Sequence, residues 1–253
     1  MTQNERRIFL IRALLDEQGT KNAVPQDVFE QKRLLRGLMN VRPPKAAGEE
    51  FLAVQDAYLK EAIREKGVTA LSDLTPLRPH LYLWRGDITT LSVDAIVNAA
   101  NSALLGCFSP NHGCIDNAIH TYAGIQLRLA CDALMRAQGH AEPTGTAKLT
   151  PGFNLPAKFV LHTVGPIVSG PLAERHCKEL ASCYESCLAL AAEHNLKSVA
   201  FCCISTGVFG FPQKEAARIA VETVTAFQKE RPIDVVFNVF KEADLLIYRK
   251  LLQ

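Results

Sequence analysis

The sequence predicts an α/β sandwich with a central sheet, preceded by a helical N-terminal extension. In the first third of the chain, apolar residues recur at helical spacing, whereas from residue 78 onward strand, loop and helix patterns alternate. The continuous apolar run over 198–204 is typical of a strand that is covered on both faces. We therefore divide the 253-residue chain into an extension over 1–77 and an α/β domain over 78–253.

The extension is predicted to hold amphipathic helices. Prolines interrupt its helical pattern at Pro25 and at the pair Pro43 and Pro44, which separates three helical segments. The pattern ends before 75–80, where two further prolines favour extended chain. We expect the apolar stripes of these helices to pack on one another or on the following domain.

The α/β domain is predicted to alternate strands and helices. The predicted strands cover 81–84, 95–98, 158–163, 198–204 and 233–240, and the predicted helices cover 115–137, 175–194, 213–228 and a last segment from 244. Ligands of open α/β sheets bind at the carboxyl ends of the strands. The loops that follow these strands are therefore where function is expected.

Composition and charge exclude several classes of protein. With 48% hydrophobic and 21% charged residues, the chain is neither disordered nor a membrane protein, and a net charge of +2 leaves no overall footprint for nucleic acid. We expect no nucleic-acid and no membrane partner. Arg12 interrupts the apolar stretch near the N-terminus, so we expect no signal peptide and a cytoplasmic protein. The eight cysteines are then reduced thiols or metal ligands.

The loop over 204–212 joins a buried strand to a helix. Gly207 and Gly210 allow its backbone N–H groups to turn toward an anion at the helix N-terminus, which suits a diphosphate. The loop lacks the Gly-Lys-Ser/Thr ending of a P-loop. A tight strand-to-helix turn without a ligand would use two glycines in the same way.

Two further loops carry polar side chains. Asp87 follows a strand, where its carboxylate can accept hydrogen bonds from an adenine amino group or cap its own backbone. Asn98 and Asn101 offer donors and acceptors to a sugar.

The segment after Asn101 contains three residues of the types that bind metal ions. Cys107, His112 and Cys114 form the pattern Cys-x4-His-x-Cys, which is the donor set expected of a catalytic zinc with one position left open. Two buried thiols and a loop histidine would have the same spacing. The spacing alone leaves both interpretations open.

The motifs together resemble the ADP-ribosyl-hydrolase branch of the macrodomain family. They are, in order, Gly-Asp-Ile-Thr, Val-Asn-Ala-Ala-Asn-Ser-x-Leu-Leu-Gly, Cys-Ile-Asp-x-x-Ile-His-x-x-Ala-Gly, His-Thr-Val-Gly-Pro and Ser-Thr-Gly-Val-Phe-Gly-Phe-Pro. The resemblance runs from Leu81 to the C-terminus and implies a three-layer α/β/α sandwich with a central mixed sheet. Where other hydrolytic macrodomains have a run of glycines, this chain has the Cys-x4-His-x-Cys segment. In that segment and in its helical extension it is similar to the zinc-dependent bacterial and fungal subgroup.

The resemblance also implies roles for individual residues at the nucleotide. Asp87 would hold the adenine amino group with Ile88 beside it, and Phe240 would stack on the adenine ring. Phe209 would lie over the distal ribose. The diphosphate would be wrapped by backbone amides of Ser205, Thr206, Gly207, Val208 and Gly210.

The remaining roles concern the chemistry. Asn101 would hydrogen-bond the distal ribose, and Asp116 stands where related hydrolases place a catalytic carboxylate. His120, one turn further along the same helix, is interpreted as a packing or hydrogen-bonding residue outside the site. One Zn²⁺ would be the cofactor.

The activity that this resemblance implies is removal of single ADP-ribose units from modified proteins, at Asp or Glu side chains, with a catalytic zinc. The substrate would be a mono-ADP-ribosylated protein, with a lipoyl-carrier protein as a candidate, and ADP-ribose the product. Two alternatives stay open: an ADP-ribose-binding reader without hydrolysis, and a hydrolase whose zinc is only structural. Attack at the anomeric carbon, as in a glycosidase, and attack at the ester carbonyl both stay open as well.

Overall fold

The computed structural model describes residues 1–20 and 22–253 and confirms the predicted α/β class. Its main sheet has the strand order β2-β8-β7-β4-β6-β5. The strands are β2 (Leu81–Arg85), β4 (Ala95–Ala100), β5 (Ala147–Pro151), β6 (Phe159–Val164), β7 (Ser198–Phe201) and β8 (Asp234–Val239). All neighbouring pairs are parallel except β5 with β6, so the sheet is mixed.

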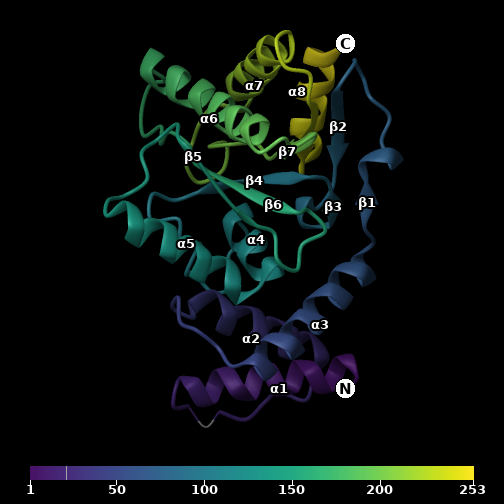
Figure 1. Ribbon diagram of the computed structural model, residues 1–253, viewed down its shortest axis with the longest axis vertical. Helices are drawn as coiled ribbons and strands as arrows, with labels where there is room; N and C mark the ends of the chain where they lie inside the picture. Colours follow the sequence, from purple (N-terminus) through teal and green to yellow (C-terminus); the bar gives the residue numbers. More distant parts are fainter. Residues whose placement is uncertain (21) are drawn as a thin grey trace.

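Helices cover both faces of this sheet (Figure 1). On one side lie α6 (Glu174–Glu193), α7 (Gln213–Gln228) and α8 (Glu242–Leu252), and on the other α4 (Ile115–Ala123) and α5 (Ile125–Gln138). The inner strands β4, β6, β7 and β8 are almost wholly buried, and their apolar side chains join those of the helices in one buried cluster, whereas the edge strands β2 and β5 are mostly half-buried. The result is the expected three-layer sandwich, stabilised mainly by apolar burial.

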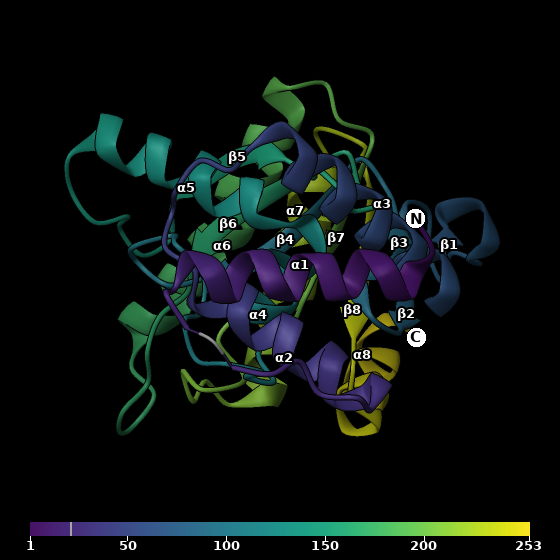
Figure 2. The same cartoon turned by 90° about the horizontal axis from the view of Figure 1, so that it is seen from below.

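The N-terminal helices form a further layer beneath α4 and α5 (Figures 1 and 2). They are α1 (Gln3–Glu17), α2 (Val28–Val41) and α3 (Glu49–Lys66), and they share a second buried cluster to which Ile125 of α5 also belongs. Thr2 caps α1 in a capping box, and Asp27 caps α2. A short strand, β1 (Thr69–Ala70), pairs in parallel with β3 (Leu91–Ser92). The boundary after residue 77 stays a prediction.

Two sequence predictions were wrong in detail. The predicted helix over 115–137 is two helices, because Gly124 adopts φ +97° between α4 and α5, and a Cβ there would lie 2.7 Å from Oε1 of Gln126. The predicted strand over 198–204 ends at Phe201, since the chain leaves the sheet to form the following loop. The sequence analysis also missed β5, a short edge strand that ends in Pro151.

The topology gathers the candidate residues at one edge of the sheet. Because β2, β8, β7 and β4 are neighbours and parallel, the segments that follow them emerge side by side. These segments carry Asp87, Phe240, the 202–212 loop and Asn101, respectively. Within the described ranges, no helix has both the length and the apolar character that a bilayer crossing requires.

Candidate active site

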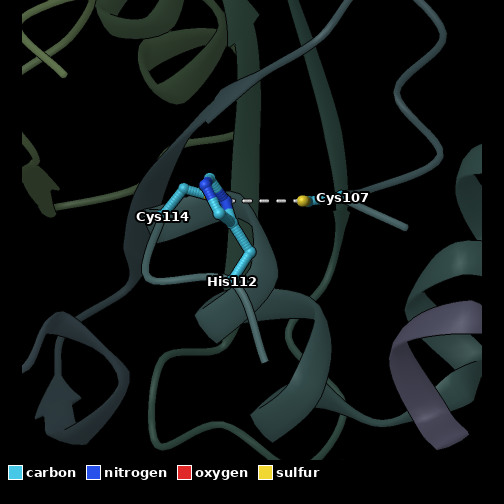
Figure 3. Close-up of side chains that lie close together, drawn as sticks. All are labelled: Cys107, His112 and Cys114. Atoms are coloured by element: carbon cyan, nitrogen blue, oxygen red, sulfur yellow. Dashed lines mark hydrogen bonds between the residues drawn. The ribbon is translucent and has the colours of Figure 1, made fainter. Parts of the chain in front are cut away.

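The three candidate metal ligands come together at the start of α4 (Figure 3). Cys107 and His112 lie in the loop between β4 and α4, and Cys114 is the N-cap residue of that helix. Sγ of Cys107 lies 3.6 Å from Nδ1 of His112, and the three donor atoms all lie within 4.8 Å of one another. The structure therefore brings all three predicted ligands into one group.

This group fits a zinc ion. In a tetrahedral site with bonds of about 2.3 Å to sulfur and about 2.0 Å to nitrogen, the two donors lie about 3.5 Å apart, close to the 3.6 Å between Cys107 and His112. Burial and the adjacent Cys107 sulfur raise the pKa of Cys114 to about 11, despite a hydrogen bond from the backbone N–H of Asn117. A bound divalent cation would keep Cys114 as a thiolate despite its raised pKa. Two sulfurs with one nitrogen leave a fourth coordination position open.

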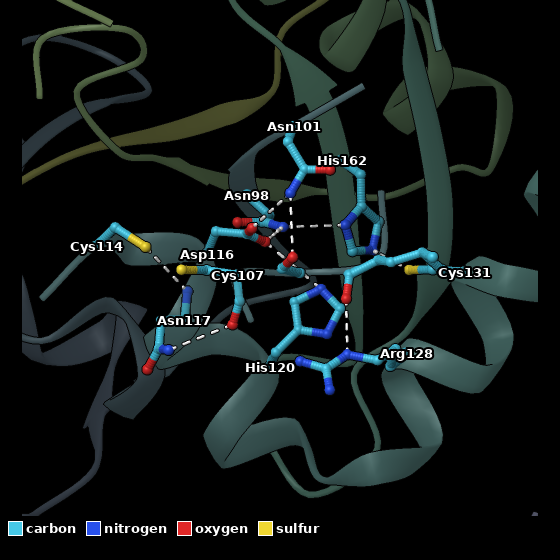
Figure 4. A network of polar contacts seen from close by, with 12 residues as sticks. Asn98, Asn101, Cys107, Cys114, Asp116, Asn117, His120, Arg128, Cys131 and His162 are labelled. Atoms are coloured by element: carbon cyan, nitrogen blue, oxygen red, sulfur yellow. Dashed lines mark hydrogen bonds and ion pairs between the residues drawn. The ribbon is translucent and has the colours of Figure 1, made fainter. Parts of the chain in front are cut away.

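Asp116 is the buried carboxyl group beside this loop (Figure 4). Its Oδ1 accepts a hydrogen bond of 2.8 Å from Nδ2 of Asn98, and its Oδ2 lies 3.4 Å from Nδ2 of Asn101. Burial raises the pKa of Asp116 to about 6, although the Asn98 hydrogen bond and the charge of Arg128 oppose the shift. Carboxyl groups with a raised pKa in such surroundings are frequent in active sites.

Asn101 is held in place by its own loop. Its Nδ2 donates to the carbonyl of Gly106 at 3.1 Å, and its Oδ1 accepts from the N–H of Ala103 at 3.0 Å. The side chain is half-buried next to Asp116, so the two residues predicted to act together are neighbours in the structure.

Two buried histidines lie behind Asp116. Nε2 of His120 is 3.5 Å from Oδ1 of Asp116, and burial lowers the pKa of His120 well below its ordinary value. Burial lowers the pKa of His162 to about 4. Nδ1 of His162 accepts from Asn98, which places the ring proton on Nε2, 2.9 Å from the hydroxyl of Thr150.

His120, His162 and Cys131 also bring their donor atoms within 4.8 Å of one another. Nε2 of His162 lies 3.8 Å from Sγ of Cys131. The contacts of His162 with Asn98 and Thr150 favour a hydrogen-bonded core over a second metal site.

The 202–212 loop contains the segment over 204–212 that is predicted to bind an anion. Ser205 adopts φ +63°, and its carbonyl accepts from the N–H of Phe211 at 3.0 Å. In the described part of the chain, the N–H groups of Gly207, Val208 and Phe209 have no protein acceptor. Val208 is 80% exposed. The loop thus offers unpaired donors together with an apolar side chain that a ligand would cover.

Gly165 lies against this loop and provides a test of it. A Cβ on Gly165 would lie 2.1 Å from Oγ of Ser205, so we expect Gly165→Ala to displace Ser205 and to weaken ADP-ribose binding about tenfold, as overpacking typically costs about 1–3 kcal/mol. Isothermal titration calorimetry measures the change. The matched control is Gly170→Ala, whose new Cβ would have no heavy atom within 4 Å. Equal affinities of the two variants would show that the loop does not bind the ligand.

The predicted adenine end is contacted by the N-terminal extension. Oδ1 of Asp87 accepts from the backbone and hydroxyl of Thr89, and Oδ2 pairs with Nζ of Lys66 at 2.7 Å. Burial by itself would raise the pKa of Asp87, but the hydrogen bonds from Lys66 and Thr89 lower it overall. The side chain of Ile88 is buried in the core, whereas Phe240 is 77% exposed and available for stacking on a ring.

The sequence analysis missed several neighbours of the site. The separation of four residues between Asp116 and His120 places both on one helix face, and this spacing was the available signal for His120. Asn98 was predicted only as a residue that can hydrogen-bond a sugar, although its side chain also donates to Asp116 and orients it. No feature of the sequence indicated that Lys66 belongs to the site, because it is distant in sequence from Asp87.

Comparisons with known proteins relate this chain to a family and to solved structures. A family model described as Macro domain matches residues 97–220. The chain is 59% identical over 100% of both chains to a Treponema medium protein named protein-ADP-ribose hydrolase. It is 49% identical to a Staphylococcus aureus protein of the same name, over 100% of this chain and 97% of that protein. A Trypanosoma brucei macrodomain solved in complex with ADP-ribose is 34% identical and superimposes with a TM-score of 0.67, covering 83% of this chain and 92% of that one.

Proposed function

This chain belongs to the macrodomain family, and from that premise we propose that it is a protein-ADP-ribose hydrolase that uses zinc to release single ADP-ribose units from Asp or Glu side chains. The relatives' names support the hydrolase class. The observation that carries the proposal is the buried carboxyl of Asp116 beside the three candidate ligands. A module that only binds ADP-ribose needs neither feature.

The substrate's nucleotide would lie along the carboxyl ends of the parallel strands. Asp87 and Phe240 would bind the adenine after β2 and β8, and the unpaired amides after β7 would bind the diphosphate. The distal ribose then reaches the end of β4, where Asn101 presents its amide. This order places the bond to the modified side chain next to Asp116 and the metal loop.

The chain's own residues would perform the acid–base chemistry. Ionised Asp116 would accept a proton from the attacking water, and Asn98 would hold that carboxylate in position. Asn101 would orient a ribose hydroxyl. When bound by Cys107, His112 and Cys114, zinc would supply a Lewis acid with one open position for a sugar oxygen or a water.

The proposal is tested by the metal content of the purified protein and by release of ADP-ribose from a carboxylate-linked, auto-modified protein before and after a chelator. We expect about one zinc per chain and loss of release on chelation that returns with added zinc. Tight ADP-ribose binding without release would leave a reader. Release that survives complete removal of zinc would leave the hydrolase and remove the metal from its chemistry.

The same assay in ¹⁸O-water separates the two sites of attack. Attack at the anomeric carbon would place the label in ADP-ribose, whereas attack at the ester carbonyl would place it in the freed carboxylate of the protein. Mass spectrometry of both products distinguishes them.

The setting of the reaction is part of the proposal. All eight cysteines are free thiols, which supports a reducing compartment such as the cytoplasm. The resemblance to zinc macrodomains makes a lipoyl-carrier protein a candidate substrate, and a panel of modified proteins including such a carrier tests it directly.

A further inference from the structure

We propose that helix α2 of the N-terminal extension positions the ligands of the proposed metal centre. In this inference Arg36 is a positioning residue: through Asn117 it holds the loop with Cys107 and His112 at the separation from Cys114 that one metal ion requires. The inference rests on the proposed function, because it concerns the zinc ligands. It extends that function to residues more than 70 positions away in the sequence.

The three ligands differ in how firmly the fold holds them. Cys114 belongs to α4 as its N-cap, and its Sγ accepts from the backbone N–H of Asn117 at 3.4 Å. Cys107 and His112 instead lie in a segment without helix or strand. Their distance from Cys114 therefore depends on the contacts that fasten this segment to the rest of the molecule.

Asn117 of α4 connects the metal-ligand loop to the helix. Its side chain is fully buried, and its Nδ2 donates to the carbonyl of Ser109 at 3.0 Å and to that of Cys107 at 3.5 Å. An amide can serve two loop carbonyls only if its nitrogen faces them, so its oxygen must face a donor on the opposite side.

Arg36 of α2 is that donor. Its Nε and Nη2 reach Oδ1 of Asn117 at 3.1 and 2.7 Å, and Nη2 also donates to the carbonyl of His112 at 3.0 Å. One guanidinium thus orients the amide that holds Cys107 and directly holds the backbone of His112. The flat, forked donor of arginine makes this bridge possible, whereas lysine offers a single ammonium.

The next turn of α2 continues the contact. Oδ1 of Asn40 accepts from the N–H of Asn111, and its Nδ2 donates to Oγ1 of Thr121 on α4, both at 2.9 Å. Gly37 lies between Arg36 and Asn40 on this helix, and a Cβ at Gly37 would lie 3.2 Å from Nδ2 of Asn111. Helix α2 therefore packs against the metal-ligand loop. It hydrogen-bonds the carbonyl of His112 and the backbone N–H of Asn111.

Residues that support metal ligands from outside commonly change affinity by about 10–100-fold when replaced. We therefore expect Arg36→Met to weaken zinc binding about 10–100-fold, with a smaller loss in Arg36→Lys. Competition with a chromophoric chelator gives the affinity. Visible absorption of the cobalt(II)-substituted protein reports whether the ligand geometry is tetrahedral, independently of activity.

The controls separate positioning from folding. Arg33→Met alters an exposed arginine of the same helix and is expected to bind zinc as the wild type does. Because Arg36→Met leaves the buried Oδ1 of Asn117 without its donor, the metal-free melting temperature of this variant should fall by a few degrees, so zinc affinities are compared at a temperature where both metal-free proteins are folded. The double variant Arg36→Met, Asn117→Ala should lose less zinc affinity than the sum of the two single losses, because both residues share the contact at Oδ1 of Asn117, whereas the bond to the carbonyl of His112 is lost only with Arg36.

The outcomes distinguish this inference from the proposed function. Unchanged zinc affinity and an unchanged cobalt spectrum in Arg36→Met would overturn the role of α2 and leave a zinc-dependent hydrolase in place. Equal losses in Arg36→Met and Arg33→Met would also overturn it, since the loss would then lie in the helix as a whole. A wild-type protein that binds no zinc would overturn the metal part of the proposed function and this inference with it.

Discussion

Cys114→Ser is expected to abolish zinc binding and to slow ADP-ribose release about a thousandfold, because a metal contributes several kcal/mol to the stabilisation of developing charge. Serine suits this test because Cys114 is also the N-cap of α4, accepting from the N–H of Asn117. A serine oxygen preserves that cap while removing the thiolate. The change therefore isolates the loss of the metal from the loss of the helix start.

The measurements are metal content, initial rate of release, ADP-ribose affinity and melting temperature, each compared with the metal-free wild type. Cys177→Ser, a half-buried cysteine on α6 outside the ligand group, is the matched control and should retain activity. If Cys114→Ser melted well below the metal-free wild type, the loss of activity would be due to a destabilised N-terminus of α4 and not to the loss of zinc alone. If metal-free wild type itself melted far below the zinc form and bound ADP-ribose poorly, the zinc would be structural.

Asp116→Asn is expected to lower the rate of release at least about a hundredfold, within the range that a general acid or base contributes. The substitution keeps the volume of the side chain and the acceptor that Asn98 uses, but it removes the charge and the ability to take a proton. The affinity for ADP-ribose should change by only a few fold, because the residues proposed to contact the adenine and the diphosphate lie elsewhere in the site.

Single-turnover kinetics and calorimetry separate these two quantities. Asp132→Asn on α5, where the carboxylate pairs with Arg136 at the surface, is the matched control. Release at the wild-type rate from Asp116→Asn would remove this carboxylate from the chemistry. A loss of affinity as large as the loss of rate would make Asp116 a binding residue instead.

Much of the site could be predicted because its parts are local in sequence. Cys107, His112 and Cys114 lie within one loop, so their spacing made a ligand group one of two interpretations, and the structure then brought the three donor atoms together. Asp87 and the 202–212 loop follow strands, and parallel strands bring their carboxyl ends to the same edge whatever the strand order is. The break at Gly124 escaped prediction, since apolar periodicity continues across it and only the positive φ reveals the turn.

The sequence by itself determined the class of fold, the family and the chemical types gathered in the site, because element periodicity and short motifs are encoded among near neighbours. Only the tertiary structure decided which distant side chains complete the site. Lys66 meets Asp87, and Arg36 meets Asn117, solely because the N-terminal helices pack beneath α4 and α5. Such pairs depend on the orientation of whole packed elements, and no spacing along a single chain segment specifies that orientation.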